Sequence, residues 1–443
     1  MVSPRIAGSS SNALEFNPTD GETYLLNKGA GGRKNPQTTF SSPAKTFANM
    51  FISIVGAGVL GLPYAFMRMG WVMSLLLLSF IALLTCYCMM LLVKTRRRLD
   101  AIVEDSSIVS FGDLGFAVCG PPGRVVVDFL IVLSQAGFCI GYLIFIGNTA
   151  ANLMNGDGSA VRGLNVYLTG GVEILGFSLK SLVIWACVPF QLGLNSIKTL
   201  THLAPLSIFA DLVDLGAMGV VMAEDVIKMM RHREDLVAFG GLSMFFYGMG
   251  VAVYAFEGVG MVIPLEAEMR DKRKFGKILS ISMVFIFLMY GGFGLLGYFA
   301  FGENTKDIIT ANFGKGLIST LVQLGLCINL FFTFPLMMNP VYEIFERRFC
   351  GGQYCLWLRW LLVVLVTLVA LLVPNFADFL SLVGSSVCCA LGFILPAAFH
   401  LLVFKDEMGW SGWIVDSGII ALGMIFAISG TWYSLMEILK ITV

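Results

Sequence analysis

The sequence has few charged residues for its length. Asp, Glu, Lys and Arg make up 13% of the 443 residues, whereas 57% are hydrophobic, and the mean hydropathy is +0.82. A soluble protein of this size needs far more charge to cover its surface. The 29 basic and 29 acidic residues cancel, so no overall positive field favours nucleic acid as a partner. These shortages predict an integral membrane protein that does not bind nucleic acid.

The sequence also lacks the residue patterns of common catalytic and metal sites. It has three histidines, and no Cys–His, Ser–His–Asp or metal-ligand spacing is recognisable. The ten cysteines lie mainly in apolar runs or in segments that we place on the cytosolic side, which favours reduced thiols over disulfides. We therefore expect neither an enzyme nor a protein that carries a cofactor or a metal.

Long apolar stretches predict the fold. A membrane-spanning helix needs about 20 mainly apolar residues, and eleven such stretches occur in this chain. They cover residues 45–67, 71–93, 124–153, 175–194, 199–222, 241–263, 275–302, 317–342, 355–373, 376–403 and 412–437. The sequence therefore predicts an all-α integral membrane protein with eleven transmembrane helices.

The basic residues predict the orientation, because Lys and Arg are enriched in cytosolic loops. If the N-terminus is cytosolic, 20 of the 29 basic residues fall on the inner side, chiefly in clusters at 94–98 and 270–277. Residues 1–44 are polar and rich in Ser, Gly, Asn and Thr, which predicts a disordered cytosolic tail. An odd number of spans then places the C-terminus on the opposite face.

Two of the apolar stretches contain signals that interrupt a helix. Residues 56–63 read GAGVLGLP and residues 257–264 read EGVGMVIP, so each has closely spaced glycines followed by a proline. Glycine loosens a helix and proline removes a backbone donor. Free backbone groups inside a membrane must line a cavity or meet a ligand, and matched breaks in two halves of a transporter point to its binding site.

These positions predict that the first and sixth helices are broken, as in a five-plus-five inverted repeat of the leucine-transporter type. The first repeat would cover residues 45–222 and the second residues 241–403, with an eleventh helix appended at 412–437. The alternative is that the glycines merely allow close packing between helices.

The same segments resemble a known family. Residues 47–49 (FAN) and 56–66 (GAGVLGLPYAF) resemble the first helix of the amino acid/auxin permease family. Residues 254–266 (YAFEGVGMVIPLE) are similar to the sixth helix of its proton-coupled amino acid transporter branch, and residues 374–376 (PNF) resemble its tenth helix. Residues 210–216 (ADLVDLG) look most like the plant vacuolar amino acid transporters.

The resemblance implies proton coupling and small free amino acids as substrates. In such folds the broken helices offer backbone amides to the substrate carboxylate and backbone carbonyls to its ammonium group. Carried onto this chain, the carboxylate falls near residues 56–59 and the ammonium near the carbonyls of residues 53–54 and 254–256. The implied substrate-binding residues are Ser53, Ile54, Gly56, Ala57, Gly58, Val59, Tyr254, Phe256 and Gly258.

Acidic residues inside the predicted spans are candidates for proton coupling, because burying their charge is costly. Glu257 stands at the start of the second break. It either accepts hydrogen bonds from unwound amides or takes up and releases the coupled proton. Asp211 and Asp214 lie on one face of the fifth predicted helix, where they either share a proton or bond to a neighbouring helix.

Together these features predict a secondary active transporter of small neutral amino acids, proton-coupled and located in the vacuolar membrane, with the plasma membrane as the other possible site. The expected partners are free amino acids, protons and the lipid bilayer. Sodium coupling stays open, since Asn329 and Thr333 in the eighth predicted helix offer oxygen ligands. An amino acid sensor with the same fold is the alternative from a different functional class.

Overall fold

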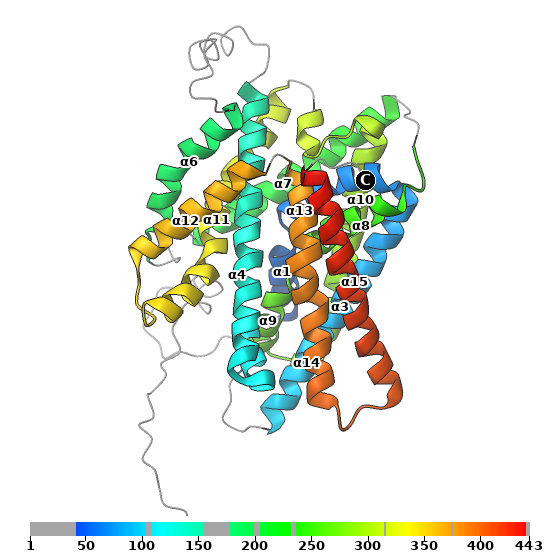
Figure 1. The fold of residues 1–443 in the computed structure, drawn as a ribbon. Helices are drawn as coiled ribbons and strands as arrows, with labels where there is room; N and C mark the ends of the chain where they lie inside the picture. Colours follow the sequence, from blue (N-terminus) through cyan, green and yellow to red (C-terminus); the bar gives the residue numbers. More distant parts are fainter. Residues whose placement is uncertain are drawn as a thin grey trace, which may run out of the picture.

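A computed structural model describes residues 41–102, 108–154, 178–198, 204–231, 236–313, 316–373 and 375–439. Within these ranges the secondary structure is helical, apart from one isolated bridge between Ser41 and Met269. Figure 1 shows the long helices standing side by side as a bundle, with α1 among them. Most of the predicted tail, residues 1–40, lies outside the described residues, whereas the first helix begins at Pro43.

The helices of the first half of the chain are α1 (Pro43–Ile54), η2 (Ala57–Gly61), α2 (Leu62–Met69), α3 (Trp71–Ile102), α4 (Phe111–Met154), α6 (Leu179–Asn195) and α7 (Ala204–Arg231). Those of the second half are α8 (Leu242–Ala255), η4 (Val259–Met261), α9 (Val262–Glu268), α10 (Phe275–Phe301), α11 (Leu317–Phe349), α12 (Leu356–Leu372), α13 (Phe376–Val383), α14 (Leu395–Phe404) and α15 (Trp410–Leu439). Two π-helical turns, η8 (Gly384–Cys388) and η9 (Ala390–Ile394), interrupt the path from α13 to α14.

Among the described residues, seven helices are long and apolar enough to cross a membrane, and eight if the bent pair of α1 with η2–α2 counts as one span. The remaining predicted stretches hold α6 and α12, which are apolar but 17 residues long, and α7, which carries several charged residues. An all-helical membrane protein is therefore confirmed, while a count of eleven spans stays a prediction.

Helix α3 runs to Ile102, nine residues beyond its predicted end at residue 93. The basic cluster at 94–98 is therefore helical and not a loop. Arg96 in this cluster is buried at 7% exposure, and its guanidinium lies 2.6 Å from the Glu266 carboxylate on α9. Because a buried charge requires a partner, this pair explains why the helix extends past the apolar stretch.

The two interrupted stretches lie in the interior of the bundle. We call α1, η2 and α2 the first broken helix, and α8, η4 and α9 the second. Helix α2 packs against α8, and α1 packs against α9, so the two broken helices contact each other on both sides of their breaks. Helix α10 packs against both α1 and α2 and therefore flanks the first break along its length.

Candidate functional site

The first break is an interruption of two residues followed by a tight helical turn. Helix α1 ends at Ile54, and Gly56 is fully extended with φ −155° and ψ −163°. The Val59 amide then donates to the Gly56 carbonyl at 3.3 Å, and the two parts of the helix meet at a bend of 49°. The last carbonyls of α1 and the first amides of η2 lack the partners that a continuous helix would give them.

The second break has the same hydrogen-bond pattern. Helix α8 ends at Ala255, Gly258 has φ −177° and ψ 9°, and the Met261 amide donates to the Gly258 carbonyl at 3.1 Å. In each break a glycine accepts the first hydrogen bond of a short 3-10 turn, and a proline follows in the next helix. The structure thus confirms that both predicted helices are interrupted at the predicted glycines.

The glycines of the breaks differ in what surrounds them. A Cβ atom on Gly58 would lie 2.9 Å from the Cα of Ala255 and 3.0 Å from the Tyr254 ring. A Cβ on Gly258 would lie 2.5 Å from the Ile54 side chain. A Cβ on Gly56, in contrast, would meet nothing within 4 Å. Gly58 and Gly258 therefore allow the two broken helices to touch, whereas Gly56 borders open space beside the free amides.

Tyr290 of α10 reaches both breaks and was missed by the sequence reasoning. Its hydroxyl lies 3.2 Å from the carbonyl oxygen of Ile54 and 3.1 Å from that of Ala255. These are the last residues of α1 and α8, within the carbonyl sets predicted to face the substrate ammonium. The available signal was a buried tyrosine hydroxyl in an otherwise apolar helix, which needs a polar partner, but the sequence does not show which partner.

The other predicted ammonium-side residues point in different directions. The Ser53 hydroxyl donates to the Met50 carbonyl at 3.0 Å, within its own helix. The Tyr254 ring packs edge-on against Phe138 of α4, with centroids 4.9 Å apart. Its hydroxyl is buried and has no hydrogen-bond partner among the described residues. Phe256 is buried against Tyr290, so the backbone of these residues, more than their side chains, faces the break.

Glu257 lies in the second break, as predicted. Its carboxyl group faces the backbone amide of Val259, the first residue of η4. It also lies near Cys388, the last residue of the π-helical turn η8, and near Cys389, which follows it. The carboxyl group therefore joins the second break to the irregular part of the tenth predicted helix, and both roles considered for it stay open.

Of the two aspartates on α7, Asp214 has a described side chain. The side chain of Asp211 lies outside the described residues. Asp214 is buried at 7% exposure on α7, which packs against α10, and it lies near Tyr290. Asp214 is thus near the carbonyl ends of α1 and α8 only through Tyr290, which contacts both. Glu257, in contrast, lies against the first amide of η4 in the second break.

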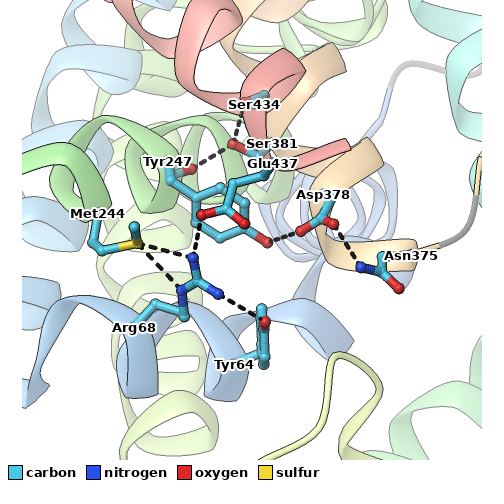
Figure 2. A network of polar contacts seen from close by, with 9 residues as sticks. All are labelled: Tyr64, Arg68, Met244, Tyr247, Asn375, Asp378, Ser381, Ser434 and Glu437. Carbon is cyan, nitrogen blue, oxygen red and sulfur yellow. Dashed lines mark hydrogen bonds and ion pairs between the residues drawn. The ribbon is translucent and has the colours of Figure 1, made fainter. Parts of the chain in front are cut away.

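A polar network connects α2, α8, α13 and α15 (Figure 2). Arg68 on α2 donates to Tyr64 at 3.2 Å and pairs with Glu437 on α15. The Tyr247 hydroxyl of α8 donates to Asp378 of α13 at 2.8 Å, and the Arg68 guanidinium lies 5.4 Å from the Tyr247 ring centre. The network therefore joins α2, which follows the break in the first broken helix, to α8, which precedes the break in the second.

A second cluster of polar contacts lies around α9 and the start of α1. Glu266 on α9 is 1% exposed and binds both Arg96 at 2.6 Å and Arg97 at 3.0 Å, on α3. The Ser41 amide, two residues before α1, donates to the Glu268 carbonyl at 2.8 Å. The start of the first broken helix is therefore attached to the end of the second.

Sequence comparison with known proteins identifies the family of the chain. Residues 39–436 match the family described as transmembrane amino acid transporter protein. Amino acid transporter AVT3C from Arabidopsis thaliana is 65% identical over 439 residues, 99% of each chain, and AVT3B from the same plant is 66% identical over 419 residues, 95% of this chain and 97% of its own. Vacuolar amino acid transporter 4 from Saccharomyces cerevisiae is 25% identical over 82% of this chain and 53% of its own.

Proposed function

The chain belongs to the transmembrane amino acid transporter protein family, and we propose that it is a proton-coupled secondary transporter that moves small neutral amino acids across the vacuolar membrane. The matched pair of breaks is the observation that carries this proposal. A zwitterion needs donors for its carboxylate and acceptors for its ammonium group at a short separation. The two breaks offer both from the backbone.

The helix ends have the polarity that an amino acid requires. The amides of Ala57 and Gly58 begin η2, and a helix start carries partial positive charge that favours a carboxylate. The carbonyls of Ile54 and Ala255 end α1 and α8, and a helix end carries partial negative charge that favours an ammonium group. The side chains next to the breaks are apolar or aromatic apart from Glu257, which supports a neutral substrate side chain.

Proton coupling is assigned to Glu257 and Asp214, with Asp211 as a third candidate. Glu257 lies in the second break, and Asp214 lies near Tyr290, whose hydroxyl contacts the carbonyl ends of both breaks, so a change in the protonation of either acid can act on the backbone that binds the substrate. The vacuolar location rests on the yeast relative, whose name includes it.

The arrangement of contacts supports the five-plus-five repeat. Rotating one repeat onto the other exchanges α1 with α8, α2 with α9, and α3 with α10. Accordingly, α1 packs against α10 while α8 packs against α3, and α2 packs against α10 while α9 packs against α3.

We further propose eleven spans with a cytosolic N-terminus. Epitope tags at both ends, probed before and after permeabilisation, would refute this if both lie on one face.

Transport by the purified full-length protein in proteoliposomes tests the function directly. We expect saturable uptake of radiolabelled alanine that is driven by an imposed pH gradient and is indifferent to sodium. Uptake that requires sodium would replace proton coupling with sodium coupling through the helix that carries Asn329 and Thr333. Binding without uptake would replace the transporter with a sensor.

A further inference from the structure

Tyr290 connects the two broken helices at their carbonyl ends. Its hydroxyl lies 3.2 Å from the Ile54 oxygen and 3.1 Å from the Ala255 oxygen. The side chain is fully buried, and its ring packs against Phe256 with centroids 5.2 Å apart. A phenol has one proton to donate, whereas the two carbonyls together have four lone pairs, so the pair keeps capacity for further donors.

The surroundings of this hydroxyl favour a cationic ligand. The negative ends of α1 and α8 converge on it. The Gly56 amide faces the hydroxyl oxygen, which orients the phenol proton toward the carbonyls. Asp214 is buried on α7, which packs against α10, and it adds a carboxylate near the same hydroxyl. An ammonium group, which carries three donors and a positive charge, is complementary to this arrangement.

Helix α10 is suited to hold the hydroxyl in place. A Cβ on Gly294 would lie 2.7 Å from the Phe66 ring, and a Cβ on Gly297 would lie 2.8 Å from Pro63. Both neighbours belong to α2, so glycines on α10 let it pack tightly along the first broken helix, one and two turns beyond Tyr290. The position of the hydroxyl is thus fixed relative to the break.

We propose that Tyr290 is a positioning residue for the substrate ammonium group: its hydroxyl holds the Ile54 and Ala255 carbonyls together as one acceptor pair, and Asp214 acts on that pair through Tyr290. This rests on the amino acid transport proposed above. The consequence is specific. Loss of the Tyr290 hydroxyl weakens the recognition of the ammonium group more than that of the carboxylate.

The test compares Tyr290→Phe with a matched control, Tyr298→Phe. Tyr298 is an equally buried tyrosine on α10, but its hydroxyl accepts from the Val237 amide at 3.0 Å, away from the breaks. The KM and maximal rate for alanine, and inhibition by propionate, which lacks the ammonium group, are measured in proteoliposomes. For Tyr290→Phe we expect KM for alanine to rise roughly 3- to 15-fold, as for loss of a buried hydrogen bond in a membrane protein, while inhibition by propionate changes less.

The ratio of propionate to alanine affinity is the decisive quantity, because a loss that is purely structural weakens both ligands alike. Tyr298→Phe should leave this ratio unchanged. Tyr290→Phe with the wild-type ratio overturns the proposal. If Tyr290→Phe is not recovered folded, Asp214→Asn replaces it: a reduced preference for alanine supports the proposal, and an unchanged ratio overturns it.

A double-mutant cycle tests the role given to Asp214. If Asp214 acts through Tyr290, the effects of Asp214→Asn and Tyr290→Phe on alanine affinity are not additive. The double variant should then bind alanine as tightly as the single variant with the lower affinity. Additive effects overturn this part. If the wild-type protein takes up no amino acid, the transport function itself fails, which the wild-type measurement shows before any variant is compared.

Discussion

The contrast between Gly56 and Gly58 gives a sharp prediction about the first break. Gly58→Ala places a methyl group 2.9 Å from the backbone Cα of Ala255 and 3.0 Å from the Tyr254 ring. Backbone cannot yield as a flexible side chain does, so the two broken helices must separate. Overpacking of this kind costs about 1–3 kcal/mol. Gly56→Ala places its methyl in open space, at backbone angles that alanine adopts freely, and should change stability by less than about 0.5 kcal/mol.

Gly58→Ala should therefore lower the stability of the protein, whereas Gly56→Ala should impair transport at unchanged stability. Thermal unfolding of the purified proteins should show a lower midpoint for Gly58→Ala and a wild-type midpoint for Gly56→Ala. Alanine uptake should nevertheless weaken in Gly56→Ala, through a higher KM, because its methyl projects beside the amides assigned to the substrate carboxylate.

Gly258→Ala is an intermediate case, since its neighbour at 2.5 Å is the side chain of Ile54. Wild-type stability of Gly58→Ala would refute the close approach of the two helices. A wild-type KM for Gly56→Ala would refute the assignment of the open space beside Gly56 to the substrate.

Three further changes have defined outcomes. Glu257→Gln should still bind and exchange alanine but lose accumulation driven by a pH gradient; unchanged accumulation in proteoliposomes would make Glu257 a structural group. Glu266→Gln removes the buried carboxylate that pairs with Arg96 and Arg97 and leaves Arg96 only Asp100, at 3.3 Å, as an ionised partner; it should cost about 1–3 kcal/mol of stability, so an unaltered unfolding midpoint would contradict the pairing. Tyr247→Phe removes the 2.8 Å hydrogen bond to Asp378 and should cost about 1–3 kcal/mol; the same unfolding measurement would show no loss if the network were dispensable.

Helix content and the two breaks were predictable because both depend on local chemistry. Apolar stretches of sufficient length form helices in lipid whatever surrounds them. A Gly-rich run followed by proline favours an interruption through the backbone chemistry of its own residues. Boundaries were less predictable: the sequence placed the end of the second helix at residue 93, but α3 continues to Ile102. The added turns carry Arg96, whose partner Glu266 comes from a distant part of the chain.

By itself, the sequence of this protein determined a membrane-embedded helical chain, the residues at which two helices are interrupted, and the presence of acids beside them. It could not determine which groups meet at the breaks. Tyr290 is 35 residues from Ala255 and 236 from Ile54, and Asp214 approaches it from a third helix. Such contacts depend on how the helices pack, and the two glycines that permit the packing, Gly58 and Gly258, each fit a surface formed by the other broken helix. Only the tertiary structure therefore decided which glycine borders open space and which hydroxyl holds the carbonyl ends together.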